Sequence, residues 1–191
     1  MKDNTVTYKG NFVEGKYNGF GQLYYDQHTI FKWHANFERN AENTESFHSN
    51  LLDGDTGQDE IDDLTKFLKM SDSDKPVTQY EGEFSDGNFM GDGKFFYPNG
   101  KLKFEGNFLG GSLHGQAKFH SIDGILVYSG QFTNNQRTGY GTCYSKDGKK
   151  CYEGNVIDGL YNGKGDLYNN DEILIYSGKF EKGTCSGKGK V

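Results

Sequence analysis

Apolar and polar residues alternate along several short segments of the chain, and these segments recur at a fixed interval. Each segment reads aromatic, polar, glycine, polar, apolar, as in Tyr80-Glu-Gly82-Glu-Phe84. An N-terminal copy begins at Tyr8, three periods before Tyr80. A fixed period of this length is typical of a repeat architecture. The five later copies start 24 residues apart, at Tyr80, Phe104, Tyr128, Tyr152 and Tyr176.

The alternation within each segment predicts a β-strand with two different faces. Successive side chains of a strand point to opposite sides. Tyr80, Gly82 and Phe84 therefore share one face, while Glu81 and Glu83 share the other. The remaining copies follow the same rule, so the sheet is expected to have one aromatic face and one polar face. We expect the glycines to lie beneath neighbouring rings, which lets the aromatic side chains lie flat on the sheet.

A turn and a second strand are expected after each of these segments. The turn position is glycine in every copy but one, where Asn135 takes its place, so the position is predicted to be left-handed. A G-x-G pair such as Gly91/Gly93 follows and opens a strand with aromatic residues of its own. The repeating unit is therefore predicted to be a β-hairpin. Dipeptides typical of type I′ turns lead into the next unit, at Asn99-Gly100, Asp123-Gly124 and Asp147-Gly148.

The motif Y-x-G-x-F…G-x-G at this spacing resembles the MORN repeat, over residues 8–37 and 80–191. The resemblance implies an all-β fold, an elongated, twisted, single-layer antiparallel sheet that is open at both ends. It divides the chain into N-terminal repeats in 1–37, an interruption in 38–79 and five repeats in 80–191. The second N-terminal repeat is degenerate, and the last repeat is truncated at Val191. Because a single layer builds no deep core, adjacent repeats must stabilise one another.

The interruption accounts for the net negative charge of the chain. Residues 38–79 hold eleven acidic and four basic side chains. Residues 59–70 are predicted to form one amphipathic helix, so the expected fold class is the repeat sheet with one inserted helix. This helix either packs on the aromatic face of its own sheet or docks on a partner. Its apolar side would consist of Ile61, Leu64, Phe67 and Leu68.

Charge and cysteine content narrow the compartment and the class of partner. Outside 38–79 the acidic and basic residues nearly balance, so the array lacks the basic footprint of a nucleic-acid binder. The same balance disfavours binding to anionic membrane lipid. Cys143, Cys151 and Cys185 lack CxxC spacing, which predicts reduced thiols in a cytosolic compartment. The N-terminus has no apolar signal region, and we expect a cytoplasmic protein.

No catalytic, cofactor-binding or metal-binding residue is predicted. The run Asp53–Asp59 resembles a calcium loop, but Gln58 and Leu64 stand where the turn glycine and the bidentate glutamate are required. The run Gly159–Lys164 is one residue short of a P-loop, and its glycines belong to the repeat. Polar-face carboxylates are expected to be solvated or to form cross-strand salt bridges, as at Glu81, Glu105 and Glu153.

The function implied by the resemblance is a non-catalytic protein-interaction scaffold. Repeat-only members of the family are similar to this chain and include radial-spoke proteins and other cytoskeletal scaffolds. We therefore expect a structural subunit of a multi-protein assembly in a cytoskeletal or ciliary setting. Two alternatives stay open, which are a peripheral adaptor on acidic phospholipid and a regulatory subunit of a separate enzyme.

The aromatic face is the predicted partner-binding surface. A single-layer sheet exposes both of its sides, so its rings are expected to be partly open to solvent and to anchor a peptide or helix. The C-terminal edge strand is a second expected contact, with a partner or another copy of the chain. The predicted anchoring residues are Tyr80, Phe84, Phe104, Phe108, Tyr128, Phe132 and Tyr152.

Overall fold

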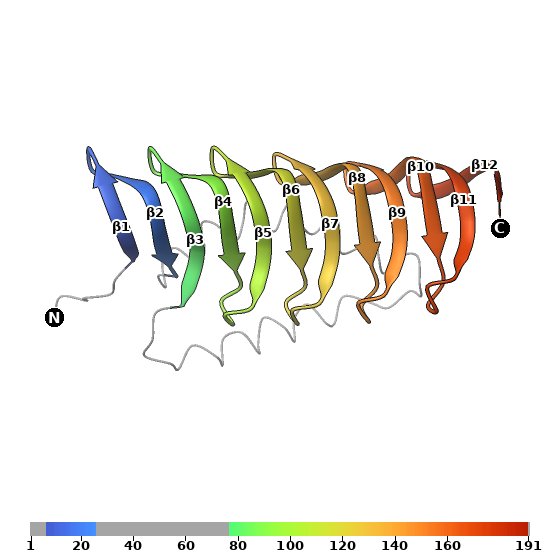
Figure 1. Cartoon of the computed structure of the whole chain (residues 1–191), viewed down its shortest axis with the longest axis horizontal. Helices are drawn as coiled ribbons and strands as arrows, with labels where there is room; N and C mark the ends of the chain where they lie inside the picture. The colour runs from blue at the N-terminus through green and yellow to red at the C-terminus, as the bar shows by residue number, and fades with distance from the viewer. Residues whose placement is uncertain (1–6, 26–76, 191) are drawn as a thin grey trace.

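In the part of the chain that the structure describes, twelve β-strands form one antiparallel sheet in which spatial order follows chain order. The computed structural model describes residues 7–25 and 77–190, and the strands lie side by side along the long axis of the molecule (Figure 1). At ~4.8 Å per strand, the array extends roughly 53 Å from β1 to β12. The strands are β1 (Tyr8–Val13), β2 (Lys16–Tyr24), β3 (Thr78–Ser85), β4 (Asn88–Phe96), β5 (Leu102–Leu109), β6 (Ser112–His120), β7 (Leu126–Thr133), β8 (Gln136–Tyr144), β9 (Lys150–Ile157), β10 (Leu160–Tyr168), β11 (Leu174–Glu181) and β12 (Thr184–Lys190).

The predicted fold class is wrong in its inserted helix. Residues 7–25 and 77–190 contain strands and turns but no helix, so the fold is a single all-β sheet. These residues form strands because their apolar positions recur at every second residue, which is the period of a β-strand. The predicted helix at 59–70, with Ile61, Leu64, Phe67 and Leu68, lies outside the described residues. The degenerate repeat near Trp33 also lies outside them.

The sheet is continuous across the interruption in the sequence. Strand β2 pairs directly with β3, with Gly21 opposite Gly82 and Leu23 opposite Tyr80. The backbone N–H of Tyr25 donates to the carbonyl of Val77 at 2.8 Å, which closes the pair. The first hairpin therefore stacks on the later repeats as though no residues lay between them.

The turn within each hairpin is left-handed at two successive residues, which is the type I′ geometry. Asn134 and Asn135 have φ values of 50° and 68°, and Asp158 and Gly159 have 50° and 77°. The prediction of a left-handed turn position is confirmed, including at Asn135. The N–H of Gly159 also donates to the carbonyl of Arg137 at 3.2 Å, so this turn links one repeat to the preceding one.

The turn between hairpins differs from the prediction. Gly100 has a φ of 80°, whereas Asn99 is not left-handed. The N–H of Gly100 donates to the carbonyl of Tyr97, and the N–H of Tyr97 donates to the carbonyl of Lys101, each at 2.8 Å. A three-residue loop with one left-handed glycine gives this pattern, so type I′ was the wrong assignment here. The dipeptide Asn-Gly is compatible with a two-residue type I′ turn and with a three-residue loop. The length of the loop decides which of the two forms.

Candidate interaction surfaces

The face of the sheet that carries the predicted anchoring residues is called the inner face here. All seven predicted rings lie on it and belong to one hydrophobic cluster. The gathering of these rings on one face is therefore confirmed. Whether they bind a partner stays a prediction.

The inner-face tyrosine rings pack flat against glycines of the sheet. A Cβ atom added to Gly130 would come within 2.5 Å of the hydroxyl oxygen of Tyr128 and 2.6 Å of Cα of Gly141. The Tyr128 hydroxyl donates to the carbonyl of Gln131 at 3.3 Å, which holds the ring flat across its own strand. Tyr152 repeats the arrangement, with its hydroxyl 2.8 Å from the carbonyl of Asn155. The predicted role of the glycines is confirmed.

Ring contacts join each repeat to the next. Tyr152 stacks on Tyr161 with centroids 3.7 Å apart and meets Phe180 of the following repeat edge-on at 5.1 Å. Tyr80 uses the same geometry, with Phe89 at 4.0 Å and Phe108 at 5.2 Å. Offset and edge-on pairs are the favoured arrangements of aromatic side chains. The core of the protein is therefore distributed along the array.

The sequence reasoning missed a second set of core residues on this face. They stand two positions after the turn glycine of each hairpin, at the start of the second strand. Their signal was available in the sequence, because the position is aromatic or aliphatic in most copies. The buried members of the set are Phe89, Leu113 and Tyr161.

The expectation that the seven rings are partly open to solvent is wrong. Their exposed fractions run from 0% at Tyr80 to 5% at Phe104. Flat packing on glycine and stacking against neighbouring rings both contribute to this burial. The inner face opens toward its ends, where Phe12 is 58% exposed and Ile175 is 39% exposed. Direct contact with a partner is therefore more accessible at the ends of the inner face than at its centre.

A buried polar cluster interrupts the aromatic pattern of the inner face. Arg137 occupies the position that is aromatic in β4 and β10, and its guanidinium carbon lies 5.2 Å from the ring centre of Tyr128. Burial raises the pKa of the Cys143 thiol to about 12, and nearby Arg137 only partly opposes this rise. Burial also raises the pKa of the Cys151 thiol. Both cysteines are free thiols and, as protonated groups, are poor nucleophiles.

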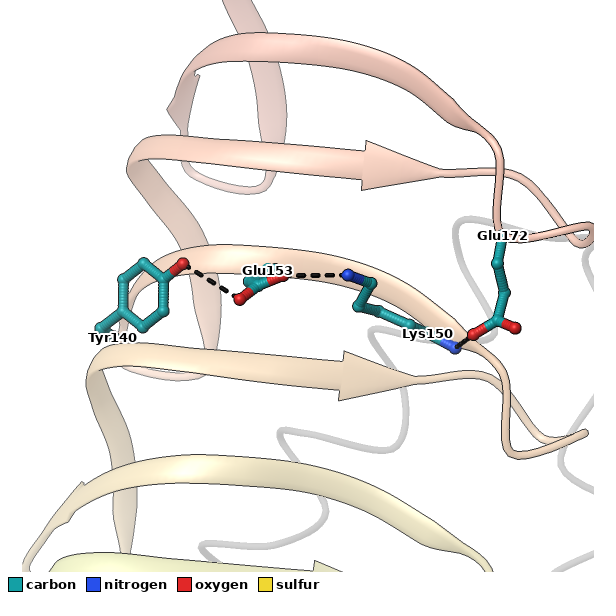
Figure 2. Close-up of polar contacts among 4 residues, drawn as sticks. All are labelled: Tyr140, Lys150, Glu153 and Glu172. Carbon is teal, nitrogen blue, oxygen red and sulfur yellow. Dashed lines mark hydrogen bonds and ion pairs between the residues drawn. The ribbon is translucent and has the colours of Figure 1, made fainter.

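The opposite side of the sheet is called the outer face, and it holds an ordered polar network (Figure 2). The hydroxyl of Tyr140 donates to Glu153 at 3.3 Å, and Nζ of Lys150 donates to the same carboxylate at 3.0 Å. Lys150 Nζ lies 4.2 Å from the ring centre of Tyr168, and its backbone N–H donates to Glu172 at 2.9 Å. The hydrogen bond to Glu153 is the largest cause of the raised pKa of Lys150. This network fixes side chains of three neighbouring strands and the turn beyond them.

Two sequence expectations can be compared with the outer face. Glu105 lies between Lys94 at 3.7 Å and Lys118 at 3.9 Å, so a cross-strand ionic ladder is confirmed there. Aromatic residues also occupy this face, which the description of a purely polar face had missed. They end the second strand of four hairpins, one residue after an inner-face position, as in Tyr24, Phe96, Tyr144 and Tyr168.

Within residues 7–25 and 77–190, no group of three His, Cys, Asp or Glu side chains is arranged to hold a metal ion. No helix long and apolar enough to cross a membrane occurs in these ranges.

The family assignment rests on a match to the MORN repeat model. Six matched segments cover more than half of the 191 residues, at 8–29, 80–101, 104–125, 128–150, 152–171 and 176–191. No curated protein matches the chain at a significant level. MORN repeats are generally non-catalytic and are typical of scaffolds that bind other proteins or membrane lipids. The chain belongs to the MORN repeat family.

Proposed function

We propose that this protein is a non-catalytic scaffold that binds other proteins as a structural subunit of a larger cytoplasmic assembly. One observation carries the proposal, which is the uninterrupted single-layer sheet of twelve strands. A single layer has a large surface for its mass, and its repeats contact only their neighbours. Such a shape offers little volume for an enclosed site but a long surface for docking.

The contact we favour lies at the C-terminal end of the array. Ile173, Leu174 and Ile175 are consecutive and 59%, 42% and 39% exposed. We call these three residues the apolar corner. Beside it, Tyr176 and Leu167 are only partly buried against the core. Exposed apolar patches of this kind mark interaction sites more often than isolated residues do. In this proposal the buried rings form a rigid base, and the partner contacts the apolar corner at the C-terminal end of the array.

Alternative functions differ in what they require of the surface. Binding to acidic phospholipid requires excess basic charge, whereas the array as a whole is close to neutral. A regulatory subunit of an enzyme would bind its partner through the same exposed surfaces, so the test below addresses both roles. A cytoskeletal or ciliary setting is part of the proposal and is tested by locating the tagged protein in cells.

The proposal is tested by comparing the proteins that copurify with three tagged forms of the full chain. The test variant carries Ile173→Ser and Ile175→Ser in the apolar corner. The control carries Val13→Ser and Leu109→Ser at hairpin turns outside β8–β12, where the exposed fractions are similar, 55% and 52%. We expect partners to be recovered with the wild type and the control and to be depleted at least tenfold with the corner variant. Equal recovery with both variants would contradict the proposed contact, and recovery of no partner would contradict the scaffold role.

A further inference from the structure

Three lysines lie on the outer face of the last three strands, one on each strand. Lys164 of β10 and Lys179 of β11 are register partners, so they stand directly opposite each other. Lys188 of β12 holds the same repeat position as Lys164, one period of 24 residues later. All three side chains are exposed. We call these residues the lysine row.

The lysine row is not neutralised by the part of the chain that the structure describes. No carboxylate within residues 7–25 and 77–190 forms an ion pair with any of the three. This contrasts with Lys94 and Lys118, which share Glu105. Like charges directly opposite each other destabilise a sheet. An external anion would relieve this repulsion.

The row continues toward the centre of the array as an uncharged polar line. Tyr140 of β8 is the register partner of Asn155 of β9, and the amide of Asn155 donates to the carbonyl of Lys164 at 3.4 Å. Tyr140 is 56% exposed, and its hydroxyl is held by Glu153 (Figure 2). Tyr140, Asn155, Lys164 and Lys179 thus follow the long axis of the molecule over roughly 14 Å, at one strand spacing of ~4.8 Å per step. Lys188 lies on the next strand, β12.

The spacing of the charges indicates the kind of anion that fits. Residues three or four apart on an α-helix lie on one side and advance about 4.5–6 Å along its axis. Same-face residues of an extended peptide advance about 6.6 Å, so they drift out of step with the lysines. Binding to an anionic lipid surface does not require basic residues in a line, so the arrangement of the lysines gives no reason to favour a membrane.

We propose that the outer face of β8–β12 binds an acidic helix of a partner protein. The helix lies along the array with Asp or Glu side chains at three- or four-residue spacing over the lysine row, and an apolar side chain rests on Tyr140. This contact lies on the opposite side of the sheet from the Ile175 side chain and does not depend on the apolar corner.

The test uses two synthetic helical peptides of identical composition. One carries glutamates at positions i, i+4 and i+7, and the other distributes the same glutamates around the helix. Binding to the full chain is measured by fluorescence anisotropy at low and high salt. We expect the aligned peptide to bind at least tenfold more tightly than the scrambled one, with affinity falling as salt rises. Equal affinity for the two peptides would overturn the proposal, since charge alone would then explain the binding.

Two double variants with the same change in net charge complete the test. Lys164→Glu with Lys179→Glu should reduce affinity for the aligned peptide at least tenfold. Lys9→Glu with Lys146→Glu, at exposed positions far from the row, should change it less than twofold. A control that loses as much affinity as the row variant would contradict the assignment. Binding to vesicles that contain anionic lipid is measured with the same variants. If vesicle binding depends on the lysine row and binding of the aligned peptide does not, the surface is assigned to membranes instead.

Discussion

The fit between tyrosine and glycine on the inner face leaves no room for a side chain at the glycine. A Cβ at Gly141 would lie 2.3 Å from the hydroxyl oxygen of Tyr128, and one at Gly165 would lie 2.4 Å from that of Tyr152. Cβ atoms do not approach other atoms this closely, so the ring would have to move. In the middle of the array the ring is itself buried among neighbours, and its displacement would disturb the adjoining repeats.

Gly130→Val should therefore destabilise the protein more than Gly10→Val. Overpacking a well-packed site costs about 1–3 kcal/mol. Gly130 lies beneath the fully buried Tyr128, whereas Gly10 lies in the first strand, beneath the partly exposed Tyr8. Chemical denaturation of both variants measures the difference. Equal losses, or a larger loss at Gly10, would show that position along the array does not determine the effect.

Glu172 occupies a turn position that is glycine in the three preceding repeats. Its φ of 59° is left-handed, and its carboxylate accepts the N–H of Lys150 from the neighbouring turn. Glu172→Ala removes the carboxylate and keeps the strain, whereas Glu172→Gly removes both. The alanine variant should be less stable than the glycine variant by about 1 kcal/mol. Thermal melts of the two variants compare them, and equal stability would mean that the backbone relaxes when the hydrogen bond is lost.

The three cysteines should differ sharply in reactivity. Cys143 is 1% exposed, with a pKa raised to about 12, and the pKa of Cys151 is also raised by burial, whereas Cys185 is exposed. Because alkylation requires the thiolate, iodoacetamide at pH 8 should modify Cys185 first in the folded protein. Peptide mass spectrometry locates the label, and denatured protein, in which all three should react, is the control. Rapid labelling of Cys143 in the folded protein would show that the inner face opens.

At the scale of strands, we expect the intervening residues to be dispensable for the sheet, because β2 pairs directly with β3. Tyr25 and Val77 are already joined by a backbone hydrogen bond, so a short turn can span the gap. Replacing residues 26–76 by Pro-Asn-Gly, the sequence of the turn at 98–100, should leave a cooperatively folded sheet. Far-UV circular dichroism and a thermal melt provide the measurement. Loss of the β spectrum would mean that residues 26–76 contribute to folding.

Strand positions could be predicted from the sequence because the period of 24 residues fixes them. The face of the motif residues, such as Tyr80 and Phe84, followed from alternation, and the left-handed turn at Asn135 followed from residue type. The burial of Tyr80 and Phe108 could not be predicted, because it depends on rings that stack across strands. The lysine row also required the structure, since only strand register places Lys164 opposite Lys179. The repeating hairpin could therefore be predicted from residue type and spacing. Which side chains are exposed to solvent depends on contacts between strands, which the structure was needed to show.

At the scale of the whole molecule, the array has one core spread over twelve strands and two long faces with different chemistry. The inner face is closed at its centre and open at its ends. The outer face changes from paired charges at Lys94, Glu105 and Lys118 to lysines at its C-terminal end that form no ion pair within residues 7–25 and 77–190. Both proposed contacts lie toward that end, on opposite sides of the sheet. The C-terminal half is therefore the part of the molecule that we expect partners to contact.

The most direct test of the scaffold role is the mass of the particle that contains this protein in its native cells. We predict that size-exclusion chromatography with light scattering finds the tagged chain in an assembly far heavier than its own 21.5 kDa. We also predict that chemical cross-links from that assembly map to β8–β12 and not to the N-terminal strands. A free monomer, or an assembly whose cross-links fall only on β1–β4, would contradict the account.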